Sequence, residues 1–237
     1  MPCVSSNCGG YTLEAELGIT PNGYSEPDFL GWEVKQFGVT NFERINSSVI
    51  TLMTPEPTDG IYKTQGTETF LHTYGYADKT GREDRINFGG VHKAGVRHAS
   101  TNLEMQLIGF DQESGKIRNS NGRIALVDLA GNEAASWSFS SMLLHWNRKH
   151  NQACYVPSLS ETIGERKYKY GNKIILGIGT DFQLFLKQMA IGNIYYDPGI
   201  KMENVSTNPK IKKRSQFRIK SQHLNNLYRD SELVKLS

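Results

Sequence analysis

The chain has 237 residues, 38% of them hydrophobic and 22% charged, which is typical of a globular protein with a buried core. No run approaches the roughly 18 apolar residues of a membrane span, and Met1–Val4 lacks the basic and apolar segments of a secretory signal. Three cysteines are an odd number, which argues against a disulfide framework. We therefore expect a cytoplasmic protein with no membrane partner.

Basic residues are concentrated near the C-terminus. Residues 201–237 hold nine Lys/Arg and three Asp/Glu, which leaves 18 basic and 21 acidic side chains in the first 200 residues. Such a segment suits contact with a polyanion. A solvated basic surface would explain the same charge equally well.

Apolar spacing and Gly/Pro boundaries predict the elements in chain order. The first half reads as a helix over 11–17, strands over 29–37 and 48–53, long loops with short strands over 58–100, and neighbouring strands over 103–110 and 124–129. In the second half, the pattern predicts a helix over 139–150, with Ser138 or Ser140 as its N-cap, and a strand over 153–156. A second helix is expected over 181–191, with Thr180 as its N-cap and Gly192 at its C-terminal end. Strands over 194–196 and 216–219 and a short helix over 223–228 complete the prediction. Strands and helices without regular alternation indicate a mixed α/β or α+β sandwich.

The segment from Pro27 to Lys35 (PDFLGWEVK) carries the most informative side chains. Glu33 and Lys35 share one face of the expected strand, while the residues between and before them face the other way. Asp28 has the wrong parity for one regular strand. A tight turn or bulge at Gly31 would bring Asp28 back beside Glu33.

Two carboxylates and a neighbouring ammonium suit phosphodiester hydrolysis. Asp28 and Glu33 could hold Mg²⁺, which prefers oxygen ligands and would help to generate hydroxide. Lys35 could orient the attacking water or neutralise charge in the transition state. Glu14, on the preceding helix, could reach the metal or the lysine. The alternative is that Glu33 and Lys35 form a surface ion pair, since so short a motif also occurs by chance.

Longer segments resemble the MvaI/BcnI restriction endonucleases and the related mismatch-repair nicking enzyme MutH. The block GGYTLEAELGITPNGYSEPDFLGWEVKQFGV resembles the active-site region of that family. Further matches follow in order along the chain: SVITLMTPEP, AASWSFSSMLLHW, ERKYKYGNKIILG and KKRSQFRIK. The resemblance thus covers most of the sequence.

This resemblance implies a PD-(D/E)xK, MutH-like fold, a mixed sheet flanked by helices with two lobes around a DNA cleft. It implies a Mg²⁺-dependent type II restriction enzyme that acts on double-stranded DNA as a monomer, nicking one strand at a time. Asp28, Glu33 and Lys35 fall on the catalytic positions and Glu14 on the helix glutamate. We expect one domain over 1–237, with a catalytic lobe centred on 9–150 and a basic recognition lobe over roughly 151–237.

Arg218 falls on the arginine of the family's "FRI" strand, in the lobe that reads bases. The loop before it departs from the family, because Lys210, Lys212, Lys213, Arg214 and Gln216 replace a histidine-containing loop. Lys or Arg there could pair with guanine and Gln216 with adenine. Alternatively, all of them could hold phosphates and carry no sequence information.

A second basic loop contains Lys93, Arg97 and His98, flanked by glycines. It could enter a groove or touch the DNA backbone, or it could be a solvated loop.

Two rival functions stay open. One is a repair nickase of the MutH type, and the other is a DNA-binding module without catalysis. The chain could also be cut from a longer protein with an N-terminal regulatory domain, and a cognate methyltransferase would be a separate partner.

Overall fold

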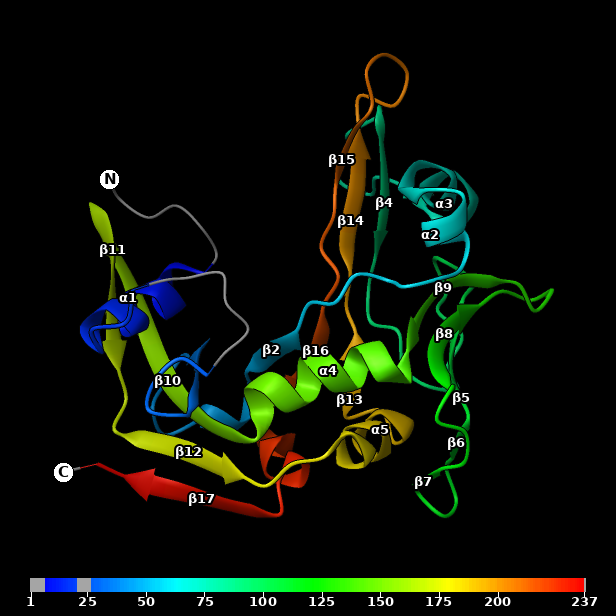
Figure 1. Ribbon diagram of the computed structural model, residues 1–237. Coiled ribbons are helices and arrows are strands. Elements are labelled where there is room, and N and C mark those ends of the chain that lie inside the picture. Colours follow the sequence, from blue (N-terminus) through cyan, green and yellow to red (C-terminus); the bar gives the residue numbers. More distant parts are fainter. Residues whose placement is uncertain (1–6, 21–26, 237) are drawn as a thin grey trace. The chain divides into compact units, whose positions relative to one another are not determined.

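The computed structural model describes residues 7–20 and 27–236, and Figure 1 labels most of its helices and strands. The chain forms two compact units. Unit 1 comprises residues 1–50, 145–184 and 219–237, and unit 2 comprises 51–144 and 185–218. The expected lobes divide the chain at residue 150, whereas each unit draws on segments from both sides of it. In the described residues, no helix is long and apolar enough to cross a membrane.

Unit 1 is built on a sheet of order β1-β10-β12-β17, with β11 paired to β10. β1 (Glu33–Gly38) runs parallel to β10 (Gln152–Ile163), while β11 (Glu165–Tyr170), β12 (Lys173–Ile178) and β17 (Asp230–Lys235) pair antiparallel with their neighbours. The strand predicted over 153–156 is therefore too short. The last four residues of β10, Ser160 to Ile163, are exposed and mostly polar, so they have no apolar periodicity from which to predict a strand.

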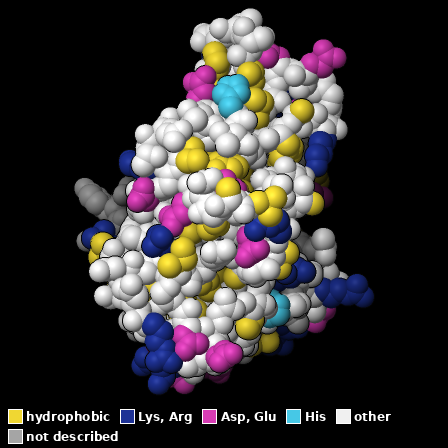
Figure 2. Space-filling model, turned by 90° about the vertical axis from the view of Figure 1, so that its right-hand side faces the viewer, with side chains coloured by type: hydrophobic (Ala, Val, Ile, Leu, Met, Phe, Trp, Pro, Cys, Tyr) yellow, Lys and Arg dark blue, Asp and Glu magenta, His cyan; other side chains and the backbone are white. Residues whose placement is uncertain are grey.

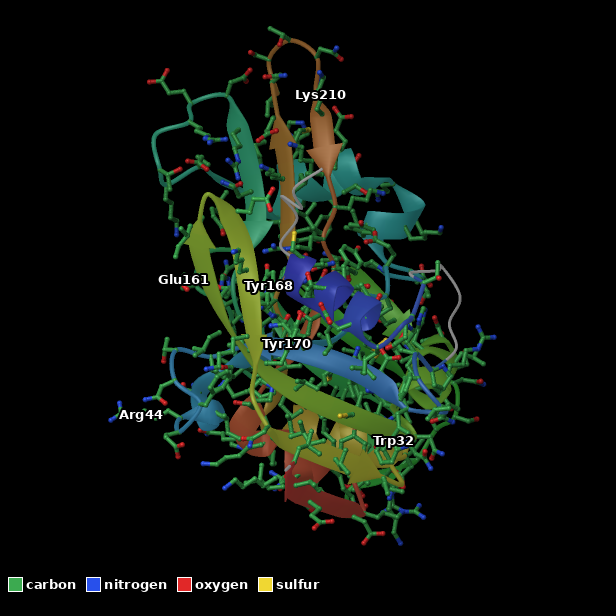
Figure 3. All side chains as sticks on the ribbon, turned by 90° about the vertical axis from the view of Figure 1, so that its left-hand side faces the viewer. Trp32, Arg44, Glu161, Tyr168, Tyr170 and Lys210 are labelled. Atoms are coloured by element: carbon green, nitrogen blue, oxygen red, sulfur yellow. The ribbon has the colours of Figure 1, made fainter. Side chains whose placement is uncertain are left out.

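Helix α1 (Cys8–Glu16) covers one face of this sheet through its apolar side. Leu13 packs with Val156 and Ile174, and Val34 joins them from β1. The Tyr170 hydroxyl donates a hydrogen bond to the Gly9 carbonyl at 2.8 Å, and Figure 3 shows α1 beside the strand that carries this tyrosine.

Cys154 is a free thiol but Cys8 is disulfide-bonded, so the odd cysteine count did not exclude a bridge.

Unit 2 includes a four-stranded and a three-stranded sheet. One has the order β15-β14-β4-β3, and the other has the order β5-β8-β9. Their strands are β3 (Tyr76–Ala77), β4 (Arg85–Gly89), β5 (Glu104–Ile108), β8 (Arg123–Val127), β9 (Glu133–Ser138), β14 (Gly199–Glu203) and β15 (Lys210–Lys212). β5 and β8 are neighbours, as the sequence predicts.

The prediction of long loops with short strands over residues 58–100 is right about the short strands, β3 and β4, but it missed two helices, α2 (Ile61–Thr64) and α3 (Thr67–Tyr74). Phe70, Leu71 and Tyr74 are buried on one side of α3 at helical spacing. The glycines that flank these short helices gave the segment the composition of a loop. Gly60 and Gly66 both adopt positive φ angles, 83° and 90°, immediately before each helix.

Six of the remaining described elements agree with the predictions to within a few residues: β2 (Val49–Met53), α4 (Phe139–His150), α5 (Phe182–Ala190), β13 (Ile194–Tyr196), β16 (Phe217–Lys220) and η2 (Ser221–Leu227), with β13, β16 and β2 forming a small sheet. Three short ones, η1 (Ile45–Ser47), β6 (Phe110–Asp111) and β7 (Lys116–Ile117), were not predicted. Ser138 Oγ accepts a hydrogen bond from the Ser141 N–H near the start of α4. Asp181 caps α5, because its carboxylate accepts the Leu184 N–H at 2.7 Å. The predicted cap, Thr180, instead donates to the Leu227 carbonyl.

Candidate functional site

A two-residue turn at Leu30 and Gly31 shapes the segment before β1. Both residues have positive φ angles, 48° and 85°, and the backbones of Phe29 and Trp32 exchange hydrogen bonds of 2.9 and 2.8 Å. This is the geometry of a tight β-hairpin turn. The pairing of Phe29 with Trp32 sets Asp28 opposite Glu33, so the two side chains share a face. The Asp28 carboxylate also accepts the Val34 N–H at 3.0 Å, which fixes its position.

Strand alternation in β1 separates a polar face from an apolar one. The Lys35 Nζ donates to Glu33 Oε1 at 2.8 Å. Trp32 and Val34, on the other face, line an apolar cavity of about 510 Å³ within unit 1, and Trp32 is labelled in Figure 3. Glu33 is therefore not part of an exposed surface pair, since its side chain is only 4% accessible.

Glu14 extends from α1 toward the same group of charges. Its pKa is raised above the ordinary value, first by burial and then by the charges of Asp28 and Glu33, whereas Lys149 and Lys35 oppose this rise. The three carboxylates thus lie within electrostatic range of one another. The four residues selected from the sequence, Glu14, Asp28, Glu33 and Lys35, come together in unit 1.

Lys149 is a member of this group that the sequence reasoning missed. Its Nζ lies 3.7 Å from Glu33 Oε2, the oxygen that Lys35 does not bind. β1 pairs with β10 so that Glu33 lies opposite Ala153, and α4 ends just before β10. The sequence signal was the basic last turn of α4 (Arg148, Lys149 and His150), directly before a strand of the same sheet.

The carboxylates fit the divalent metal that the resemblance implies. Within the described ranges, no three His, Cys, Asp or Glu side chains form a ready-made metal cluster. However, Glu33 Oε2 is buried and has no hydrogen-bond partner in the described part of the chain. A buried oxygen without a hydrogen-bond partner is what a bound cation would satisfy, and two carboxylates suit Mg²⁺, which prefers oxygen ligands and keeps several water molecules.

A second group of charged residues belongs to the sheet of β3, β4, β14 and β15 in unit 2. Figure 1 labels β4, β14 and β15 of this sheet. Residues opposite one another in register share a face, which aligns Tyr76, Asn87, Lys201 and Lys212 across the four strands. A cavity of about 620 Å³ on this polar side is lined by one carboxylate, Asp78, and by six basic residues: Lys79, Arg85, Lys201, Lys212, Lys213 and Arg214. We call these six residues the cationic sheet face.

Few carboxylates neutralise the cationic sheet face. Glu203 accepts a hydrogen bond from Lys201 at 2.9 Å and lies 3.4 Å from Lys212. The hydrogen bond from Lys201 is the main reason why the pKa of Glu203 falls to about 2. Lys213 lies over the Tyr62 ring at 5.4 Å. In contrast, Lys/Arg and Asp/Glu side chains are intermixed on the surface shown in Figure 2. The sequence reasoning found Lys212, Lys213 and Arg214 but missed Lys79, Arg85 and Lys201.

Gln216 and Arg218 differ from the exposed basic residues before them. Arg218 forms an ion pair with Asp197 at 2.5 Å. Gln216 Oε1 and Arg218 Nε are both buried without a hydrogen-bond partner among the described residues. Lys210 lies at the exposed start of β15 (Figure 3).

In the loop with Lys93, Arg97 and His98, the side chains of Arg97 and His98 contact other residues of the protein. Arg97 donates to the Asn102 carbonyl at 2.7 Å and pairs with Glu104 at 3.3 Å. The His98 ring stacks on His92 at 4.3 Å. Lys93 is exposed, so of the three it is the residue best placed to reach a ligand.

His92, beneath this loop, is expected to make stability pH-dependent. Its pKa falls from 6.5 to about 3, first through burial and then through the charge of His98. Because the folded pKa is the lower one, the unfolded chain binds more protons below pH 6.5, and stability is lost as the pH falls from 6.5 toward 3. The free energy of unfolding should drop by about 2 kcal/mol between pH 6.5 and 5 from this group.

Urea unfolding at both pH values, beside a His92→Gln variant, measures the contribution of His92. The variant should lose most of the pH dependence, although Gln changes packing against Phe88 and lowers stability at both values. An equal pH dependence in the two proteins would assign it to other groups.

The family model of the MvaI/BcnI restriction endonuclease family matches residues 3–228. Among solved structures, a "Restriction endonuclease MvaI-cognate DNA substrate complex" is 20% identical, with a TM-score of 0.70 over 98% of this chain and 89% of that one. A second, "Restriction endonuclease MvaI in the absence of DNA", is 22% identical, with a TM-score of 0.53 over 88% and 80%. No curated protein matches the chain. The structural matches show the restriction-endonuclease-like mixed α/β fold, as the resemblance implied. From the family match over nearly its whole length, the chain belongs to the MvaI/BcnI restriction endonuclease family and is a type II site-specific deoxyribonuclease.

Proposed function

We propose that the chain hydrolyses double-stranded DNA with Mg²⁺ at a site made of Asp28, Glu33, Lys35 and Glu14. One observation supports this most strongly. Glu33 is almost fully buried, it has an ammonium group at 2.8 Å, and its second oxygen accepts no hydrogen bond in the described part of the chain. Burying a carboxylate in this way is costly unless a cation completes its surroundings.

Each side chain then has a distinct role. Asp28 and Glu33 hold the cation, and the hydrogen bond from the Val34 N–H keeps Asp28 oriented. When bound, Mg²⁺ would polarise the phosphodiester and lower the pKa of a water molecule. Lys35, anchored on Glu33, orients the attacking water or neutralises the growing charge on the phosphate. Glu14 ionises less readily than an ordinary glutamate, and a nearby divalent cation would favour its charged form.

The DNA-binding role belongs, in this proposal, to basic residues of unit 2. Lys210, Lys212, Lys213 and Arg214 hold phosphates, with Lys93 as a further contact, because all five are exposed. Gln216 and Arg218 are the candidates for reading base edges, because their side chains are partly exposed although Gln216 Oε1 and Arg218 Nε are buried. Arg97 and His98 mainly support their loop. The solved complex of MvaI with its cognate DNA substrate is consistent with double-stranded DNA as the ligand.

One set of catalytic residues per chain is also consistent with a monomer that nicks one strand per encounter.

Incubation with supercoiled plasmid and Mg²⁺ tests the proposed hydrolysis of DNA. Discrete fragments would indicate a restriction enzyme, and an open-circle intermediate that precedes them would indicate successive nicking. Open circles as the only product would indicate a repair-type nickase instead. DNA that is retarded in a gel but never cut would contradict the hydrolytic role.

Replacing Mg²⁺ by Ca²⁺ separates binding from cleavage. Ca²⁺ is larger and more loosely coordinated, so it should support DNA binding without hydrolysis. Cleavage in EDTA at the same rate as in Mg²⁺ would rule out the metal site.

A further inference from the structure

The Glu33 carboxylate lies between two ammonium groups that hold it differently. Lys35 Nζ is 2.8 Å from Oε1, and its side chain is 17% accessible. Lys149 Nζ is 3.7 Å from Oε2, and its side chain is 34% accessible. Lys149 is thus beyond hydrogen-bond distance and is the looser of the two contacts.

The backbone that carries Lys149 is nonetheless well anchored. Trp146 and His150 are fully buried in the last turn of α4, and their rings stack at 4.1 Å. Trp146 Nε1 also donates to Thr180 Oγ1 at 3.2 Å. The helix end therefore presents Lys149 at a fixed place beside Glu33, while its long side chain keeps freedom to turn toward solvent.

A cation bound at Glu33 would compete with Lys149. The oxygen that faces Lys149 is buried and has no hydrogen-bond partner among the described residues, so it is the oxygen that can still accept a metal. Two cations close to one oxygen repel each other strongly in a partly buried site. Metal binding at Oε2 therefore requires the Lys149 ammonium to move away.

We propose that Lys149 is a counter-ion to Glu33 and a positioning residue. Its ammonium group neutralises Glu33 in the metal-free enzyme and moves away when a divalent cation binds. It keeps three neighbouring carboxylates, Glu14, Asp28 and Glu33, compatible with folding before the metal arrives. In exchange, it raises the cation concentration needed to fill the site. This inference rests on the proposed metal site at Asp28 and Glu33.

Binding of Mn²⁺ to the full chain without DNA, measured by titration calorimetry, tests the competition. Lys149→Met and Lys149→Gln should bind Mn²⁺ about tenfold more tightly than the wild type, because the cation no longer displaces an ammonium group. Lys149→Arg keeps the charge and should stay close to the wild type. The matched control is Arg148→Met, an exposed charge one residue earlier on α4, which should change the affinity by less than about twofold.

Thermal denaturation gives a second readout that does not depend on DNA cleavage. In EDTA, Lys149→Met should melt below the wild type, since Glu33 Oε2 loses its facing cation. Saturating Mn²⁺ should remove this difference or reverse it. Arg148→Met should show no such dependence on metal.

Two results would overturn the inference. If Lys149→Met and Lys149→Gln bind Mn²⁺ as the wild type does or more weakly, Lys149 does not compete with the metal. If Lys149→Met melts below the wild type equally in EDTA and in Mn²⁺, its role is only structural. A wild type that binds no Mn²⁺ would instead refute the proposed metal site, and the inference with it.

Discussion

Replacing Glu33 by Gln is expected to slow single-turnover DNA cleavage at saturating Mg²⁺ by at least about 1,000-fold, the scale of losing a group that stabilises the transition state. The substitution keeps the shape of the side chain but removes the charge that holds both the metal and Lys35. Binding of a DNA duplex in Ca²⁺ should fall far less than cleavage, because most of the affinity comes from contacts with phosphates elsewhere.

Glu43→Gln is the matched control. Glu43 also pairs with a lysine of unit 1, Lys173, at 2.8 Å, but its side chain is 74% exposed. Its loss should leave the cleavage rate unchanged, since surface ion pairs contribute little. Circular dichroism of both variants checks that they are folded. Cleavage by a folded Glu33→Gln protein at the wild-type rate would exclude Glu33 from the active site.

Removing three charges from the cationic sheet face should weaken DNA binding by about 500-fold at 0.1 M salt, if each side chain contacts one phosphate. The triple variant is Lys212→Met, Lys213→Met and Arg214→Met, all exposed in the free protein. The dependence of log affinity on log salt should become shallower by about 2.7, because three fewer counterions are released. Fluorescence anisotropy with a labelled duplex, in Ca²⁺ and at several salt concentrations, measures both quantities.

A triple variant at exposed lysines that do not line this cavity, Lys63→Met, Lys116→Met and Lys167→Met, controls for net charge. Its salt dependence should stay near that of the wild type. If both triple variants behave alike, the basic C-terminal segment is a solvated surface and makes no phosphate contacts. If affinity falls only for particular duplex sequences, the three side chains read bases, which reverses the assignment made here.

The local arrangement of the active-site segment was predictable from its residues. A glycine between two carboxylates of opposite parity indicated a bend, and the structure has a two-residue turn there with Gly31 at a φ of 85°. Alternation along β1 indicated that Glu33 and Lys35 share a face, and their side chains are in contact. These features depend on backbone sterics and on neighbours in sequence, so the sequence contains them.

Segments with few apolar residues were harder to predict. Helix α3 was missed because the glycines around it gave its region a loop-like composition. The outer part of β10 was missed because its exposed, mostly polar residues are held in the strand by pairing with β11. In both cases the stabilising partner lies outside the segment, so local pattern gives little sign of it.

The sequence by itself therefore determined the turn, the face shared by Glu33 and Lys35, and the resemblance to a nuclease family. Only the tertiary structure brought Lys149 to Glu33, across 116 positions of the chain, through the parallel pairing of β1 with β10. Likewise, only the register of four strands aligned Lys201 and Lys212 on one sheet face. The physical reason is that hydrogen-bonded pairing between distant strands decides which charges meet, and no local propensity encodes that choice.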